Sequence, residues 1–275
     1  MAANNLLFHE TFQPEMTYIA KILELSINGF SGDKFTISEL TGIPTGDKKG
    51  KVEPHIKYAK YMGLVDYAYS RGDYGLSATE LGKEVWDQDR YLHETLTLWL
   101  MHYMISRSNT GAPQWAYIVR KINPGFTDDM SSTHMAALIQ KEFGLSSADA
   151  TKAFGVVKGS YSTGCFSKLF YLTWEDRIQF EEKTEKIEFG YLYAYALLNS
   201  WDELFPEKKE ITFNEVMENI AFGKVFGLND EDVDSVLSTL EKMEIISLNR
   251  QLFPVTIVRM SDSETVISNL YSMLM

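Results

Sequence analysis

The chain has 275 residues, of which 45% are hydrophobic and 13% aromatic, and its formal net charge is −12. This composition is typical of a globular protein with a large core, and the length predicts two or three domains. The single cysteine, Cys165, excludes an internal disulfide, and neither a signal peptide nor an apolar run of about 18 residues is present, so we expect a cytoplasmic protein without a membrane partner.

The first 80 residues have the pattern of a winged helix-turn-helix. A first helix is expected from about Glu15 to Asn28, because apolar residues recur there at helical spacing. Thr36 is placed to cap a short helix over 37–41, and a second helix follows over 52–62. Apolar and polar residues then alternate, and the turn residues 71–75 predict a short hairpin, the wing. We therefore predict a DNA-binding domain over residues 1–80 whose second helix enters the major groove.

Positive charge gathers over this second helix. Between Asp47 and Arg71 there are six basic residues against three acids, in a chain that is acidic overall. The helix is expected to leave two lysines and two tyrosines exposed, Lys57, Tyr58, Lys60 and Tyr61. The candidate DNA-binding residues here are Lys48, Lys49, Lys51, Lys57, Lys60, Tyr61 and Arg71. The alternative is a solvated or protein-binding face, and the spacing of the glycines at 46 and 50 does not fit a nucleotide phosphate loop.

Residues 81–185 are predicted to form a helical block. The apolar spacing and the serine caps indicate helices over 80–87, 91–106, 115–122, 132–143 and 147–155, followed by a polar break at 159–164. His102 falls inside the most apolar of these helices, where a histidine is more often a satisfied core residue than a ligand. The thiol of Cys165 is expected to be buried packing and not a nucleophile.

Residues 186–275 again have the order of a winged helix. A helix is expected from about 187 to Pro206, a short one over 213–219 capped by Thr212, an amphipathic helix after Asn229, and strands over 245–248 and 255–259. Between Ser200 and Glu244, however, there are twelve acids and four lysines, a balance that repels phosphates. We therefore expect a domain that packs or docks a partner, in which Lys224 is placed to touch one phosphate. The fold class as a whole is mainly α, of the α+β type.

His9, Glu10 and His102 are the candidate catalytic residues. An imidazole beside a carboxylate can act as a base, as a metal ligand or as a hydrogen-bonded clasp, and the clasp is the more common arrangement. The sequence contains no paired acids with a lysine of the familiar nuclease kind. No cofactor is evident, and the identity of any metal ligand stays unknown at this point.

Five blocks of sequence resemble a known family: "FHETF" at 8–12, "YAKYMGLV" at 58–65, "LSATELGKEVWDQDRYLHETLTLWLMHYMI" at 76–105, "YAYALLNSW" at 193–201 and "FGKVFGLNDEDV" at 222–233. They are similar to the signature blocks of a bacterial domain-of-unknown-function family of DNA phosphorothioation and phage-defence gene clusters, which includes the SspB-type nicking proteins. Its fixed polar residues fall here on His9, Glu10, Thr11, His102 and Lys224.

The resemblance implies contact with duplex DNA and extends to nicking of one strand to allow sulfur incorporation. It implies sulfurtransferase-like and ATPase components of a phosphorothioation system as partners. A divalent metal, Mg or Mn, is expected only if the protein is a nickase. The alternative function is a non-catalytic winged-helix adaptor or transcriptional regulator that docks other proteins.

Overall fold

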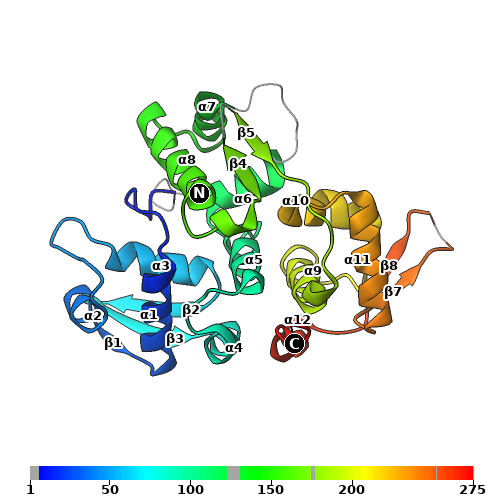
Figure 1. The fold of residues 1–275 in the computed structure, drawn as a ribbon, viewed down its shortest axis with the longest axis horizontal. Helices are drawn as coiled ribbons and strands as arrows, with labels where there is room; N and C mark the ends of the chain where they lie inside the picture. Colours follow the sequence, from blue (N-terminus) through cyan, green and yellow to red (C-terminus); the bar gives the residue numbers. More distant parts are fainter. Residues whose placement is uncertain (1–5, 123–130, 175–176, 252, 275) are drawn as a thin grey trace.

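The computed structural model describes residues 6–122, 131–174, 177–251 and 253–274. It combines helices with two three-stranded sheets and one two-stranded sheet, which confirms the predicted α+β class. In chain order the elements form a first part (α1 to α4), a middle part (α5 to β5) and a last part (η4 to η6). Helix α5 of the middle part and helix α9 of the last part lie at the centre of the molecule (Figure 1). None of the helices that the structure describes has the length and apolar content needed to cross a membrane.

The first part is a three-stranded sheet packed with helices. Its elements are α1 Met16–Ile27, β1 Ser31–Asp33, α2 Lys34–Thr41, α3 Val52–Tyr61, β2 Val65–Ser70, β3 Asp73–Ala78 and α4 Glu80–Asp89. The strands pair antiparallel in the order β1-β3-β2, with Tyr69 opposite Tyr74. Arg71 and Gly72 both have positive φ, as the tight turn of a hairpin requires, so the predicted hairpin is present.

Two local predictions in the first part differ from the structure. Helix α2 begins three residues early because Asp33, and not Thr36, is its cap: Asp33 Oδ1 accepts from the Thr36 amide at 2.7 Å. Tyr58, expected on the exposed side of α3, is fully buried, because its hydroxyl donates to the Phe12 carbonyl at 2.8 Å. The segment before α1 therefore covers a side of α3 that helical periodicity alone assigned to solvent.

The middle part is helical with one short hairpin. Its elements are α5 Thr95–Ile105, α6 Pro113–Ala116, the π-helix η2 Tyr117–Ile122, α7 Ser132–Phe143, α8 Ser147–Ser162, the 3₁₀ turn η3 Ser167–Leu169, β4 Leu172–Trp174 and β5 Ile178–Phe180. Ser131 and Ser146 cap α7 and α8 as the sequence predicted. Helix α8 extends into the predicted polar break and ends at Ser162, and the hydroxyl of the buried Ser160 donates to the Val156 carbonyl.

The last part closes on a second three-stranded sheet. Its elements are η4 Ile187–Phe189, α9 Gly190–Leu204, β6 Glu210–Thr212, the π-helix η5 Glu215–Asn219, α10 Phe222–Phe226, α11 Asp230–Lys242, β7 Ile246–Asn249, β8 Thr256–Arg259, α12 Ser263–Val266 and η6 Ile267–Asn269. The strand order is β6-β8-β7, and Asn229 caps α11 through the Asp232 amide.

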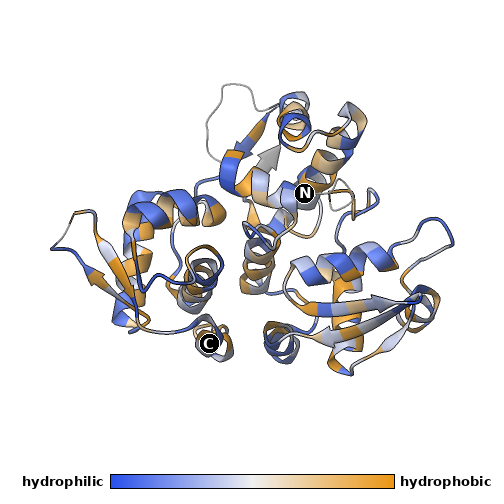
Figure 2. Ribbon diagram, turned by 180° about the vertical axis from the view of Figure 1, so that it is seen from behind, coloured by the Kyte–Doolittle hydropathy of each residue, from blue (hydrophilic) through white to orange (hydrophobic). Residues whose placement is uncertain are grey.

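The three parts share one core. Most elements mix apolar and polar residues, so that each can bury one side (Figure 2). Helix α5 is the exception, because every residue from Leu96 to Ile105 is buried. The hydroxyl of Tyr103 on α5 donates to Asn199 Oδ1 of α9 at 2.9 Å, and Thr97 bonds to the buried hydroxyl of Tyr271 at 2.7 Å. Helix α5 is therefore the element that the other helices pack around.

Candidate functional site

The exposed stripe of α3 is narrow. Glu53, Lys57, Lys60 and Tyr61 lie at i, i+4, i+7 and i+8 and share the side that is exposed or half-buried. The Tyr61 ring packs on Phe8 with ring centroids 4.8 Å apart, and burial raises the pKa of its hydroxyl. The two lysines of this stripe are therefore more accessible to a ligand than its tyrosine.

Two of the candidate lysines are already paired. Lys51 Nζ lies 2.7 Å from Glu15 Oε1, and this hydrogen bond raises the pKa of Lys51. Lys60 Nζ lies 3.1 Å from Asp66 Oδ1. Surface pairs of this kind contribute about 0 to 1 kcal/mol, so a phosphate can compete for either ammonium group.

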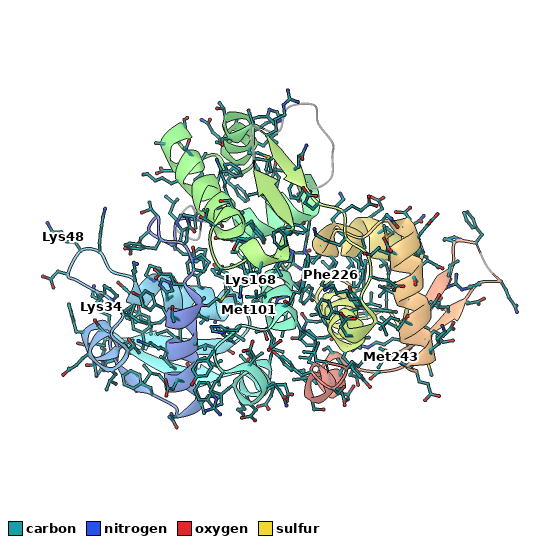
Figure 3. The ribbon with its side chains drawn as sticks, in the orientation of Figure 1. Lys34, Lys48, Met101, Lys168, Phe226 and Met243 are labelled. Carbon is teal, nitrogen blue, oxygen red and sulfur yellow. The ribbon has the colours of Figure 1, made fainter. Side chains whose placement is uncertain are left out.

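Four other candidates have no acid partner within the described part of the chain. Among the described residues, Lys48, Lys49, Lys57 and Arg71 form no salt bridge. The loop before α3 carries Lys48 and Lys49, both exposed, and Figure 3 shows Lys48 at the outer edge of the molecule. Arg71 is exposed in the β2–β3 turn. The cations thus project from the loop, the helix and the hairpin.

His9 lies in a tight turn before α1. The Thr11 amide donates to His9 Nδ1 at 3.0 Å, so the ring is neutral at this nitrogen and carries its proton on Nε2. Nε2 is buried and points toward the Leu6 carbonyl without reaching hydrogen-bond geometry, and burial lowers the pKa of His9 to about 4. Glu10 follows at φ +49°, with Oε2 buried and unpartnered. These two side chains hold unused hydrogen-bonding capacity, but no hydrogen bond between them is present.

His102 is satisfied inside the core. Its Nε2 lies 2.8 Å from the Val225 carbonyl and must donate, since a carbonyl oxygen only accepts. Nδ1 then accepts from the Tyr161 hydroxyl at 2.5 Å. The ring has no exposed surface, and burial lowers the pKa of His102 to about 3. Both nitrogens are occupied by protein groups, as the core-histidine reading of the sequence predicted.

The candidate catalytic residues do not meet. His9 contacts Phe8 and the Thr11 amide, whereas His102 contacts Trp99, Tyr161, Val225 and other residues of the core. Within the described ranges, no group of three His, Cys, Asp or Glu side chains could hold a metal ion. The proposed donor set therefore does not fit a divalent metal, and we derive no catalytic step from it.

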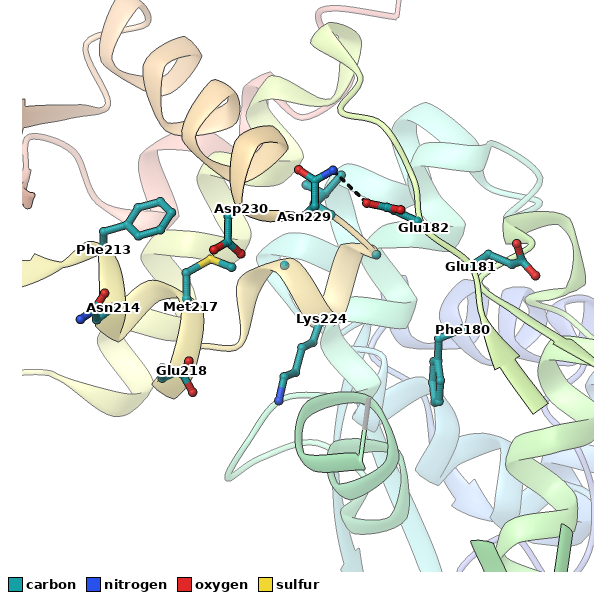
Figure 4. Close-up of a pocket in the computed structure, with 13 residues that line it drawn as sticks. Phe180, Glu181, Glu182, Phe213, Asn214, Met217, Glu218, Lys224, Asn229 and Asp230 are labelled. Carbon is teal, nitrogen blue, oxygen red and sulfur yellow. Dashed lines mark hydrogen bonds between the residues drawn. The ribbon is translucent and has the colours of Figure 1, made fainter. Parts of the chain in front are cut away.

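Lys224 lies in a pocket of about 420 Å³ between the middle and last parts. Its side chain extends from α10 into the space between Glu218 and Phe180 (Figure 4). The pocket is also lined by the acids Glu181, Glu182 and Asp230, and Glu182 accepts from Asn229 Nδ2 at 2.8 Å. This acidic pocket, with one lysine against four carboxylates, favours a cationic ligand over a phosphate.

Sequence reasoning missed Arg120. This guanidinium is buried in the π-helix η2, where Nε donates to the Ser106 carbonyl at 2.5 Å and Nη1 donates to the Ile220 carbonyl. Nη2 has no hydrogen-bond partner, and the cation lies 5.8 Å from the centre of the Tyr103 ring. The available signal was the basic pair Arg120 and Lys121 in the otherwise apolar run 117–122, because any charge that such a helix buries needs a hydrogen-bond partner.

Comparisons with known proteins agree on one group. The model of the family described as "Protein of unknown function (DUF4007)" matches residues 8–158. Two crystal structures of SspB share the fold: the magnesium ion-bound form at a TM-score of 0.75 and 15% identity, and a second at 0.72 and 16%. Each match covers 96% of this chain and 86% of the other. No curated protein sequence matches.

Proposed function

Because this chain belongs to the DUF4007 family and has the fold of SspB, we propose that it is a cytoplasmic DNA-binding component of a DNA phosphorothioate modification and phage-defence system. Its partners in that proposal are duplex DNA and the sulfurtransferase-like and ATPase components of the system. Residues 1–80, 81–185 and 186–275 act as a DNA-binding domain, a helical block and an acidic docking domain.

The first part is proposed to be a winged helix-turn-helix. The order α1-β1-α2-α3-β2-β3, with an antiparallel β1-β3-β2 sheet, supports this arrangement. Gly42 ends α2 at φ +69°, a left-handed conformation in which glycine has no steric cost, and the loop to α3 starts there. In this arrangement α3 is the recognition helix and the β2–β3 hairpin is the wing.

The observation that carries the proposal is the set of unpaired cations, Lys48, Lys49, Lys57 and Arg71. An acidic protein gains little from scattered surface lysines, but cations without acid partners on one loop, one helix and one hairpin can reach successive phosphates. The half-buried position of α3 favours contacts by the ends of long side chains over deep insertion of the helix. Affinity in this proposal comes mainly from the phosphate backbone.

Strand nicking is the enzymatic extension of the proposal, and it rests on the likeness to SspB. His9, Glu10 and His102 remain its candidate residues, and His9 and Glu10 each keep a buried polar atom without a hydrogen-bond partner, whereas both nitrogens of His102 are bonded. Incubation of supercoiled plasmid with the full chain and Mg²⁺ or Mn²⁺ tests it. Open circles that disappear with His9→Ala support nicking at this turn, whereas plasmid that stays supercoiled removes the enzymatic part.

A non-catalytic adaptor is the second candidate function, favoured by the acidic pocket around Lys224. Four carboxylates beside Phe180, Phe213 and Met217 suit a basic side chain of a partner protein. An adaptor would keep its partner after the cations of the first part are reversed and lose it when Asp230 and Glu218 are neutralised.

Duplex binding separates the two functions. We would measure fluorescence anisotropy of a labelled duplex with the full chain, with Lys57→Glu, and with Lys48→Glu/Lys49→Glu, over a range of salt concentrations. Each lost phosphate contact should lower the slope of log K against log salt by about 1. The matched control is Lys141→Glu/Lys242→Glu, which reverses two exposed lysines on α7 and α11. Equal affinities for the four proteins would overturn the DNA-binding proposal.

A further inference from the structure

A second pocket, of about 410 Å³, lies where α5, η3 and the segment 182–186 meet α9 and α10. Its volume is in the range of sites that hold a small ligand. Lys168 and Phe226, from the middle and last parts, both line it and are labelled near the centre of Figure 3. We call it the aromatic pocket.

The inner wall of this pocket is made of packed rings. The rings of Trp99 and Phe226 lie 5.9 Å apart, and Tyr193 meets Phe226 edge to face at 5.1 Å. Each of these three side chains is at least 94% buried, so the wall is fixed by the core and does not depend on a ligand for its shape. Trp99 also contacts the ring of His102 behind it, at 5.3 Å.

The rim carries an aromatic ring that the core does not use. Phe170 is 66% exposed, and its backbone is left-handed, at φ +47°. A bulky residue is rarely found in that conformation, and the exposed ring adds a cost in water. The Phe170 amide donates to the Ser167 carbonyl at 3.2 Å, which closes the η3 turn and presents the ring beside the pocket. Packing does not account for a phenylalanine at this position.

The charge of the aromatic pocket is opposite to that of the whole chain. Lys168, Lys183 and Lys186 line it, against the single acid Glu182, whose carboxylate accepts from Asn229. In the part of the chain that the structure describes, none of these lysines forms a salt bridge. Lys186 Nζ lies 5.1 Å from the centre of the Phe189 ring. The pocket therefore offers a flat apolar ring with several cations around it.

We propose that the aromatic pocket binds one unpaired nucleotide of a DNA strand, with the base stacked on Phe170 and the adjoining phosphates held by Lys168 and Lys186. Base stacking on an exposed aromatic ring with lysines along the backbone is the usual way in which proteins hold single strands. An acidic peptide would use the lysines but has no need of an exposed flat ring. This inference rests on the proposed function. It adds that DNA is bound as a single strand at a site separate from the first part.

The test compares single-stranded and duplex DNA of the same sequence. Anisotropy would be measured with the full chain, Phe170→Ala, Phe170→Tyr and Lys168→Glu/Lys186→Glu. Stacking on one ring is worth roughly 10-fold or more in affinity, so Phe170→Ala should weaken single-strand binding by about that factor, while Phe170→Tyr keeps it. The lysine pair should lower the single-strand salt slope by about 1.4, because each phosphate contact on a single strand contributes roughly 0.7. Duplex affinity should be unchanged by Phe170→Ala.

Matched controls use exposed residues elsewhere. Phe253→Ala removes a fully exposed ring near the β7–β8 hairpin, and Lys141→Glu/Lys242→Glu again reverses two remote charges. Both should bind single strands like the unmodified chain. Because Phe170 and both lysines are exposed, the variants should keep the thermal unfolding temperature of the unmodified chain, which circular dichroism checks.

The outcomes separate this proposal from the DNA-binding proposal. If single-strand affinity is the same for Phe170→Ala and Phe253→Ala, the nucleotide pocket is wrong even where duplex binding holds. If single strands bind through Phe170 and duplex does not bind at all, the pocket stands and duplex recognition by the first part falls. In a further outcome, a polyglutamate peptide displaces the strand while Phe170→Ala leaves the single-strand affinity unchanged. That result would identify an acidic-peptide site and overturn the nucleotide proposal.

Discussion

His102 on α5 and Val225 on α10 are joined across the boundary between the middle and last parts, by a hydrogen bond of 2.8 Å from Nε2 to the Val225 carbonyl. The other ring nitrogen is taken by Tyr161 of α8. One side chain thus connects three helices that are far apart in the sequence. His102 therefore has a positioning role in the core, where it has no surface in contact with water.

Replacement of His102 should be costly. In His102→Ala the Val225 carbonyl and the Tyr161 hydroxyl lose their partner and a cavity is left, so we expect a loss of about 3 kcal/mol in the free energy of unfolding. His102→Gln, which keeps a donor, should lose less. Urea unfolding measures both, and His134→Ala, at a half-buried position on α7, is the control. A cost below that of the control would contradict this role.

The effect of His102 should depend on pH. Its pKa is about 3 in the folded state, because of burial, and about 6.5 when unfolded. Below about pH 6.5 the unfolded chain therefore binds a proton that the folded chain does not, and stability falls as the pH falls. At about pH 5 this amounts to about 2 kcal/mol.

His102→Gln removes this titration, so the difference in stability between the variant and the unmodified chain should shrink from pH 7 to about pH 5. Urea unfolding at several pH values gives this difference directly. The carboxylates and His9 titrate in both proteins and cancel in the comparison. A gap that stays constant over the range would mean that the pKa of His102 is the same in the folded and unfolded chains, so that burial does not lower it.

Asp66→Asn should strengthen duplex binding. The carboxylate of Asp66 pairs with Lys60 at 3.1 Å and lies at the edge of the proposed DNA-binding surface. Its removal frees one cation and deletes one charge that repels phosphate, which predicts tighter binding by about 3- to 10-fold at low salt. Asp149→Asn, which breaks a similar pair on α8, should leave the affinity unchanged. Weaker binding by Asp66→Asn would place DNA elsewhere.

Arg120→Met should destabilise the protein more than any surface arginine substitution. Two backbone carbonyls, of Ser106 and Ile220, would lose a charged donor in a buried setting, at about 3 kcal/mol or more. Arg250→Met, which breaks an exposed pair with Asp234, should cost at most about 1 kcal/mol. Chemical unfolding of the two variants measures this difference, and equal costs would contradict it.

Local signals in the sequence predicted much of the fold. The bounds of α7, the serine caps of α7 and α8, the start of α11 after Asn229 and the β2–β3 hairpin follow from residues whose effect is short-range. Tyr58 was misplaced because the chain segment that buries it is 46 positions away. The two π-helices and the length of α8 likewise depend on packing against distant elements.

The candidate site was predicted less completely. Charge counting found the lysines of the first part but could not tell that Lys51 and Lys60 are paired, since Glu15 is remote in sequence and Asp66 lies across a turn. No local pattern indicated that η3 presents Phe170 to solvent beside Lys186, because the two residues come together only through tertiary packing.

The burial of helix α5 limits the use of truncated fragments of this protein. It has no side turned to water after Thr95, and residues from both ends of the chain cover it. A fragment that stops before α9 would expose the apolar surface of α5. Such a fragment is expected to aggregate or to bind DNA nonspecifically. The DNA affinity of such a fragment would therefore not report on the first part alone. Point substitutions in the intact chain are the better way to separate the roles of the three parts.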